Sequence, residues 1–234
     1  MENNKFFTWI QRLNSLLFLL LILLSIGLTS FIFIQNYSRD HSDSVKVANS
    51  KKTIEQPELL KLNNLDNICG TEDHYLRLTS RSSENTGLSS GGYDYSKPIR
   101  NLLFITGQQM NAHWLLDDNN SLIVETTQLG SDYHCEKKKT HAIYYEIIKK
   151  DTDQNGKLDK ADAITVALSL PDGTGFTELV TGNMEILDYQ IDGSGSLFSL
   201  LLQQGNDIVL QKYALPGFTK MTETKLNTIQ QHTN

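Results

Sequence analysis

The sequence predicts a mainly β protein, in which a single N-terminal transmembrane helix is followed by an antiparallel β-sheet domain, either a sandwich or a partial propeller. Three observations carry this prediction: one long uncharged stretch near the amino terminus, apolar residues that alternate at period two through the rest of the 234 residues, and Asp-Gly turns between the alternating runs. The expected division of the chain is a cytoplasmic stub over 1–12, a transmembrane helix over 13–34, a polar tether over 35–57 and an exported β domain over 58–234, with an inserted loop at 151–162.

The membrane segment is predicted from its length and its lack of charge. From Leu13 to Ile34 there are 22 residues without a charged side chain, enough at ~1.5 Å per residue to cross a ~30 Å hydrocarbon core. A cleavable signal peptide has a shorter apolar core followed by small residues, whereas this stretch ends in Phe31-Ile32-Phe33-Ile34. The sequence therefore favours an uncleaved signal anchor.

The orientation of the predicted membrane segment follows from the order of the short stub and the large domain more than from the Lys and Arg residues on its two sides. Lys5 and Arg12 before the segment nearly balance Arg39 and Lys46 after it. A short stub ahead of a large domain is the usual arrangement of a single-span protein with its domain exported. We therefore expect an inner-membrane protein whose C-terminal domain faces the periplasm.

The two cysteines, Cys69 and Cys135, both lie in the exported part. In an oxidising compartment they can close one disulfide, and the alternative is two unpaired buried thiols. Together with His74, His134 and His141 they also allow a zinc site, but no tight Cys-x-x-Cys pair supports it.

The part after the anchor begins without apolar periodicity. Gln35 to Gln56 is polar and charged, as expected of a tether, and Pro57 closes it. Between Glu58 and Leu65 the leucines have helical spacing, which predicts one short helix.

Beyond Asn67 the pattern changes to period two. Ile143, Tyr145 and Ile147 alternate along one run, and Ile164, Val166, Leu168 and Leu170 along another. Shorter runs of the same kind occur at His74 to Thr79, Ile99 to Thr106, Ala112 to Leu116, Leu122 to Thr127, Met184 to Ile191, Leu197 to Gln203 and Asp207 to Ala214. The sequence thus predicts about ten antiparallel strands.

Two turns repeat 20 residues apart, Pro171-Asp172-Gly173-Thr174-Gly175 and Ile191-Asp192-Gly193-Ser194-Gly195. Asp-Gly turns of this kind join antiparallel neighbours. On these turns, the run from Thr165 to Leu179 and the run from Ile186 to Tyr213 resemble blades of Tol-B-type β-propellers. A closed propeller needs at least four blades of ~40–45 residues, so the resemblance implies a partial propeller, with a plain sandwich as the alternative.

The most specific chemical pattern is the loop from Asp151 to Asp162. Oxygen-bearing side chains occupy its positions 1, 3, 5, 9 and 12, with Gly156 at position 6 and an apolar residue at position 8. Calcium prefers 6–8 oxygen ligands, and a tight loop can supply them if alternate side chains point inward. The alternative is a hydrated acidic turn, since Asp, Asn and Gly also favour loops for conformational reasons.

This loop resembles the EF-hand calcium loop, and its Asp at position 12 makes it more similar to the dockerin version. Its flanks, Ala142 to Ile148 and Ala163 to Leu170, have strand patterns, so it is also similar to the calcium loops of integrin-type propeller repeats. The resemblance implies a structural Ca²⁺ held by Asp151, Asp153, Asn155, Lys157 through its carbonyl, Asp159 and Asp162. The short Asp162 implies weak affinity, ~10⁻⁴–10⁻³ M.

A serine hydrolase is a weaker alternative. Gly87-Leu88-Ser89-Ser90-Gly91 matches Gly-x-Ser-x-Gly, but neither the strand before it nor the helix after it is predicted, and a Ser/Gly-rich loop explains the same residues.

The charge balance excludes a nucleic-acid-binding surface, since residues 35–234 hold 19 basic and 26 acidic side chains. We expect a non-enzymatic, calcium-stabilised binding or scaffold module of the cell envelope that contacts a protein partner. Its alternatives are the tethered hydrolase using Ser89 and a calcium-responsive sensor or adhesion module. The oligomeric state is left open.

Overall fold

The computed structural model describes residues 9, 14, 17–19, 21–22, 24–25, 45–46, 59–81, 98–130, 135 and 139–228. Its contacts divide the chain into two units, Met1–Ser42 and Asp43–Asn234. In the first unit every described residue is helical. Among the described residues, no helix combines the length and the hydropathy that a membrane crossing requires. Most of the predicted stub, membrane segment and tether lies outside the described residues.

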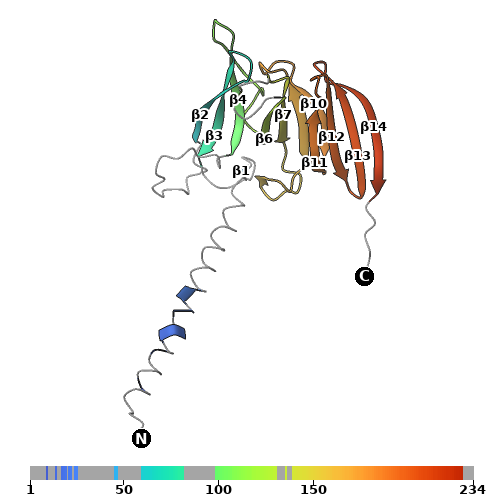
Figure 1. Cartoon of the computed structure of the whole chain (residues 1–234). Helices are drawn as coiled ribbons and strands as arrows, with labels where there is room; N and C mark the ends of the chain where they lie inside the picture. Colours follow the sequence, from blue (N-terminus) through green and yellow to red (C-terminus); the bar gives the residue numbers. More distant parts are fainter. Residues whose placement is uncertain are drawn as a thin grey trace. The chain divides into compact units, whose positions relative to one another are not determined.

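The second unit is built from antiparallel strands (Figure 1). In the described part of the chain they are β1 (Val45–Lys46), β2 (Leu59–Asn67), β3 (His74–Arg81), β4 (Ile99–Thr106), β5 (Asn111–Trp114), β6 (Leu122–Leu129), β7 (Ala142–Ile148), β8 (Lys157–Leu158), β9 (Ile164–Ser169), β10 (Thr177–Gly182), β11 (Glu185–Ile191), β12 (Leu197–Gln204), β13 (Asp207–Ala214) and β14 (Thr219–Thr228). The prediction of a mainly β, antiparallel protein is confirmed, although β1, β2, β8, β10 and β14 were not predicted as strands.

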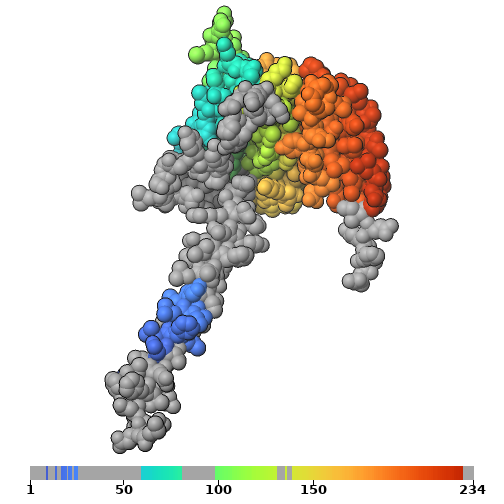
Figure 2. All heavy atoms as spheres, viewed as in Figure 1, coloured from blue at the N-terminus to red at the C-terminus, as the bar shows by residue number. Residues whose placement is uncertain are grey.

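Twelve of these strands form three successive four-stranded groups, each with neighbours in chain order, while β1 and β8 pair with each other in a separate two-stranded sheet. We call β2-β3-β4-β5 the first sheet, β6-β7-β9-β10 the second sheet and β11-β12-β13-β14 the third sheet. The first and second sheets share one residue pair, Ile99 with Ile123, which formally joins them into one eight-stranded sheet. The colours of Figure 2 follow the same order, from cyan for β2 and β3 to red for β14.

The second sheet is the centre of the core, because it is buried on both faces. On β7, Tyr144 packs toward the third sheet with Phe198, Leu200 and Tyr213, whereas Ile143, Tyr145 and Ile147 pack with Leu102 and Phe104 of the first sheet. The Tyr144 ring stacks on Tyr189 of β11 with centroids 3.9 Å apart. Each such buried side chain contributes roughly 1.5–3 kcal/mol of transfer free energy, so β7 and its neighbours hold the three sheets together.

The short helix predicted between Glu58 and Leu65 is wrong, because these residues belong to strand β2. The reason is a bulge: Asn64 has a positive φ of 50° and the register shifts between Asn63 and Leu65. The bulge returns Leu65 to the face that Leu60 and Leu62 share. The resulting spacing of two and then three residues imitates part of a helical pattern.

Both Asp-Gly turns join antiparallel neighbours, as predicted. The turn at 171–175 links β9 to β10, and the turn at 191–195 links β11 to β12. In the first turn, Gly173 has a φ of +82°, and a Cβ built there would lie 2.5 Å from the Phe104 ring of β4. Glycine is therefore needed at this position for both its conformation and its close packing.

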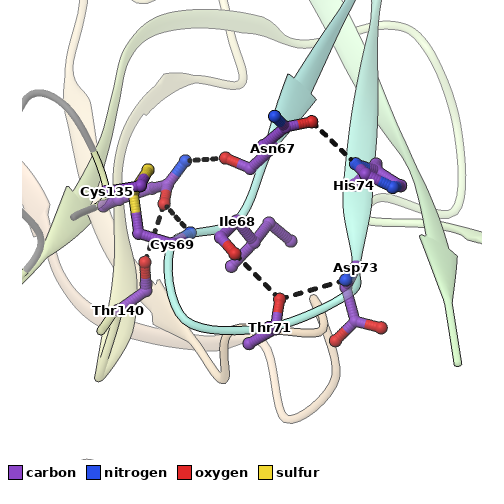
Figure 3. The surroundings of a disulfide bond; sticks show 9 residues. Asn67, Ile68, Cys69, Thr71, Asp73, His74, Cys135 and Thr140 are labelled. Atoms are coloured by element: carbon purple, nitrogen blue, oxygen red, sulfur yellow. Dashed lines mark hydrogen bonds between the residues drawn. A yellow bond between two sulfur atoms is a disulfide. The ribbon is translucent and has the colours of Figure 1, made fainter. Parts of the chain in front are cut away.

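A disulfide joins Cys69 to Cys135 and so links the chain after β2 to the connection between β6 and β7 (Figure 3). Thr140 donates its backbone N–H to the Cys69 carbonyl at 2.8 Å. Gln128 of β6 accepts hydrogen bonds from the Cys69 N–H at 2.9 Å and the Thr140 hydroxyl at 2.7 Å. Of the two alternatives for the cysteines, the structure has the disulfide.

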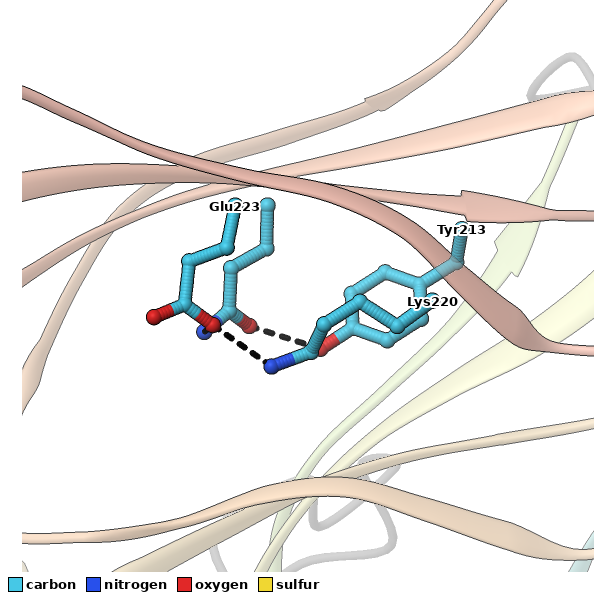
Figure 4. Close-up of polar contacts among 4 residues, drawn as sticks. Tyr213, Lys220 and Glu223 are labelled. Atoms are coloured by element: carbon cyan, nitrogen blue, oxygen red, sulfur yellow. Dashed lines mark hydrogen bonds and ion pairs between the residues drawn. The ribbon is translucent and has the colours of Figure 1, made fainter.

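A polar chain borders the core at the last two strands (Figure 4). The Tyr213 hydroxyl donates to Gln211 Oε1 at 2.6 Å, Gln211 Nε2 donates to Glu223 Oε2 at 3.1 Å, and Lys220 Nζ pairs with the same oxygen at 2.6 Å. Burial, and then the Glu223 charge, raise the pKa of Tyr213 to about 12. The tyrosine therefore remains a neutral donor, and the charged side chains of β14 mark the edge of the core.

Candidate metal centre

The loop from Asp151 to Asp162 connects β7 to β9, two adjacent strands of the second sheet. Both flanks are strands, as the sequence predicted, and not the helices of an EF-hand. Because β7 and β9 pair along their length, the loop closes a hairpin at the centre of the domain.

Three of the predicted ligands come together. One carboxylate oxygen from each of Asp151, Asp153 and Asp162 lies within 4.8 Å of the others. No other group of three acidic, histidine or cysteine side chains with this geometry occurs in the described part of the chain. Such a cluster can hold a metal ion.

Asp162 is the buried member of the cluster, with 3% of its surface exposed. Its Oδ1 accepts hydrogen bonds from the Thr152 N–H at 2.6 Å, the Thr152 hydroxyl at 3.1 Å and the Asp153 N–H at 3.3 Å, while Oδ2 accepts from the Asp159 N–H at 3.0 Å. Burial alone would raise the pKa of Asp162, because it disfavours the charged form. The hydrogen bonds from these donors have the larger combined effect and lower the pKa of Asp162 below its ordinary value. Position 12 is therefore an ionised carboxylate at neutral pH.

The first half of the loop wraps around Asp151 and Asp153. Asp151 accepts the N–H groups of Asn155 at 3.1 Å and Gly156 at 2.8 Å. Asp153 accepts the Asn155 N–H at 3.0 Å. Gly156 has a φ of +81°, which a residue with a Cβ adopts at a cost of about 1–2 kcal/mol.

The remaining predicted ligands, Asn155, Lys157 and Asp159, lie beside the cluster and are not among its three carboxylates. Asn155 Nδ2 donates to Asp153 Oδ2 at 2.9 Å and to Asp159 Oδ2 at 3.3 Å, so Asn155 connects these two carboxylates. Lys157 donates its N–H to Asn155 Oδ1 at 2.8 Å.

The side chain at position 8 fixes the loop to the core. Leu158 is 3% exposed and packs with Leu122 and Ile148 in a small cluster below the loop. Lys157 and Leu158 also form strand β8, which pairs with Lys46 and Val45 of β1. Val45–Lys46 lies within the predicted tether, so this segment carries structure that its composition did not indicate.

The donor atoms of the loop fit a hard cation. The candidate ligand side chains, Asp151, Asp153, Asn155, Asp159 and Asp162, carry carboxylate or amide oxygens, with no thiolate or imidazole among them. Such sets suit Ca²⁺, Mg²⁺ or Mn²⁺ better than zinc or copper. Sequence reasoning did not identify the role of Thr152, whose hydroxyl donates to Asp162 and accepts the Ala163 N–H at 2.9 Å. The sequence signal for this role was its position next to Asp151, a predicted ligand.

The other candidate sites fare differently. Ser89 and its glycines lie outside the described residues. Zinc binding by Cys69 and Cys135 is not compatible with their disulfide. His74 instead shares a hydrogen bond with Asn67 at 2.9 Å, and His134 lies outside the described residues.

No protein-family model matches the chain, and no curated protein matches it. Among solved structures, one similar chain comes from "Crystal structure of Nidogen/Laminin Complex", with 12% sequence identity, a TM-score of 0.25, and coverage of 69% of this chain and 79% of that chain.

Proposed function

We propose that this chain is a calcium-stabilised β domain, held at a membrane by residues 13–34, that works as a binding or scaffold module of the cell envelope. The observation that carries the proposal is the cluster of Asp151, Asp153 and Asp162, each of which has a carboxylate oxygen within 4.8 Å of the others. Bringing three carboxylates this close costs repulsion, which a divalent cation relieves.

The proposed role of the ion is structural. The loop closes the β7–β9 hairpin, and Leu158 anchors it to the core beside Ile148. A cation shared by the two ends of the loop, Asp151 and Asp162, would hold the ends of β7 and β9 together. Asn155, Asp159 and the Lys157 carbonyl complete the proposed Ca²⁺ ligand set.

Calcium titration into the detergent-solubilised full chain tests this proposal. We expect one-site heat of binding and a higher melting temperature in calcium than in chelator, both lost in Asp151→Ala. Asp117→Ala, which removes an exposed aspartate from the connection between β5 and β6, is the matched control and should leave both unchanged. No heat and no shift in the unmodified chain would reduce the loop to a hydrated acidic turn.

The membrane anchor is a separate part of the proposal, supported by the 22 uncharged residues from Leu13 to Ile34. The C-terminal domain is proposed to face the periplasm, and the disulfide between Cys69 and Cys135 favours an oxidising compartment. Membrane fractionation tests the anchor: the chain should resist alkaline extraction and dissolve only in detergent. Protease added to spheroplasts should digest the domain if it is exported.

A second candidate function is a calcium-responsive sensor or adhesion module. The observation that favours it is the pairing of β1 with β8, because it makes the loop a contact site for the segment that follows Met1–Ser42. Pull-down of envelope proteins in calcium and in chelator distinguishes the two: only a responsive module changes its partners with calcium.

A further inference from the structure

The first sheet has an apolar face that is not part of any of the three core clusters. Its central row crosses all four strands, because Leu65 pairs with Leu76, Leu76 with Leu103, and Leu103 with Trp114. Side chains at paired positions lie on the same face of a sheet, and positions two apart share that face. We call this surface the outer face of the first sheet: Leu60, Leu62, Leu65, Leu76, Leu103, Ile105 and Trp114.

The opposite face of the same strands is the one that enters the core. The neighbouring row is Asp66, Tyr75, Phe104 and His113, of which Tyr75 and Phe104 pack against the second sheet. The outer face therefore points away from the second sheet.

Part of the outer face is exposed to solvent although it is apolar, whereas Leu78 and Asn101, which pair in the row of Leu62, are buried. Leu65 is 58% exposed, Trp114 43%, Leu62 40% and Leu60 37%. Solvent-facing sides of antiparallel sheets are usually polar. A contiguous apolar patch of this kind marks an interaction surface.

The third sheet provides the contrast at the other end of the domain (Figure 2). Two rows of its outward face are Asp188, Leu201, Leu210 and Thr224, and Gln190, Ser199, Lys212 and Thr222. Polar and charged side chains interrupt both rows. The stack of sheets thus ends in a polar face on one side and in an apolar face on the other.

The charges of the first sheet also avoid its outer face. Asp66 and Arg77 form an ion pair, with Arg77 Nε 2.8 Å from Asp66 Oδ2, on the side of the core. Lys61 pairs with Thr79, which is two residues from Arg77 on β3, so Lys61 lies on the same face as Arg77 and not on the outer face. The cross-strand rows of the outer face contain no Asp, Glu, Lys or Arg. Two such faces can therefore meet without like-charge repulsion, although the whole chain carries a net charge of −6.

We propose that the outer face of the first sheet binds a second copy of this chain in a two-fold symmetric dimer. A two-fold axis brings the same patch of both subunits together, so the patch must be complementary to itself. An uncharged apolar sheet face is self-complementary. It carries no charged side chain that would select a different protein by charge complementarity. Sheets pack about 10 Å apart, so the two rows of Leu65, Leu76, Leu103 and Trp114 interdigitate across the axis.

The size of the face suits a weak but specific dimer. Three strands of about eight residues and one of four, about 4.8 Å apart with about 3.3 Å per residue, cover roughly 400–500 Å². Two copies then bury roughly 800–1,000 Å² in total, the size of weak, transient interfaces and below the roughly 1,200–2,000 Å² of stable ones. The dimer uses neither the metal loop nor residues 13–34, so it stands independently of the proposed function.

Sedimentation velocity of the detergent-solubilised full chain, over a concentration series at two detergent levels, tests the dimer. The variants are Leu62→Lys on the outer face and Leu187→Lys on β11, two substitutions of the same type at leucines that are each 40% exposed. We expect a monomer–dimer equilibrium whose dissociation constant rises at least tenfold in Leu62→Lys and is unchanged in Leu187→Lys. A monomer at every concentration, or an equal effect of both variants, would overturn the proposal, including the case in which another protein covers this face.

Tryptophan fluorescence gives a second readout that needs no destabilising change. In Trp9→Phe, Trp114 is the one remaining tryptophan of the chain. Its emission should shift to shorter wavelength as the protein concentration rises through the dissociation constant, since dimerisation removes the ring from water. A dimer that leaves the Trp114 emission unchanged would place the interface elsewhere and overturn the assignment.

Discussion

Val45 is the antiparallel strand partner of Leu158, the residue at position 8 of the acidic loop. The two residues are 113 positions apart, yet the pairing of β1 with β8 joins the start of the second unit to the loop that contains Asp151, Asp153 and Asp162. The loop that contains these carboxylates thus also supplies the strand partner of residues 45–46.

Calcium should protect the backbone of Val45 and Lys46 from hydrogen exchange. A strand pair of two residues is too short to be stable alone, so its population depends on how firmly the loop holds β8 in place. We expect slower amide exchange in the peptide containing Val45 and Lys46 in calcium than in chelator. Equal exchange rates in both conditions, with calcium binding demonstrated, would show that β1 docks independently of the ion.

Leu158→Ala should destabilise the domain by about 2–4 kcal/mol, because it leaves a cavity against Leu122 and Ile148. The same change should weaken metal binding, since the loop loses its attachment to the core. Chemical denaturation and calcium titration measure the two effects. Leu187→Ala removes an exposed leucine and should change stability by less than about 0.5 kcal/mol.

The strand pattern was predictable wherever one face of a strand is buried. β4, β7 and β13 have the predicted boundaries because their alternation reflects direct contact with a neighbouring sheet. β14 was missed because all ten of its residues are exposed, so no periodicity marks it. β2 was misassigned because the bulge at Asn64 breaks the period of two.

The carboxylate cluster of the loop was predictable because its signal is local: the spacing of oxygen-bearing side chains within twelve residues requires no knowledge of the tertiary structure. Its connections were not predictable in the same way. The pairing of Val45 with Leu158 and the alignment of Leu65, Leu76, Leu103 and Trp114 depend on residues far apart in sequence, whose register only the folded chain defines.

Removing the disulfide should cost about 4 kcal/mol, as expected from the unfolded-chain entropy of a loop of this length. Cys69 and Cys135 are 66 residues apart, and their bond closes a loop that contains β3 to β6. The double variant Cys69→Ser/Cys135→Ser tests this by denaturation. If the unmodified protein in reducing agent is as stable as in oxidising buffer, the bond contributes nothing to the folded state.

Gly173→Ala should destabilise the contact between the first and second sheets by about 2 kcal/mol or more. The substitution adds the cost of a positive φ and forces a methyl group against the Phe104 ring, 2.5 Å from the Cβ position. Gly193→Ala in the corresponding turn of the third sheet is the control, because its Cβ position has no heavy atom within 4 Å. Equal melting temperatures for the two variants would contradict the close packing at Gly173.

Glu146 on β7 should make stability depend on pH. Burial raises its pKa, the hydrogen bond from the Tyr144 hydroxyl to Oε1 at 2.7 Å lowers it, the Glu125 charge raises it, and the net shift is upward. Because the folded state holds the proton more tightly than the unfolded chain, the stabilising contribution is complete below the unfolded pKa of about 4.3. It is lost as the pH rises through the folded pKa.

Glu146→Gln should therefore be more stable than the unmodified protein at pH 7, with a difference that shrinks as the pH falls toward about 4. Gln keeps an oxygen that accepts the Tyr144 hydroxyl, so the substitution removes the charge and leaves the hydrogen bond. Urea denaturation between pH 4 and pH 8 measures the difference, with Glu185→Gln at an exposed position of β11 as control. A stability difference that is constant across this range would mean that packing around residue 146, and not its charge, sets the effect.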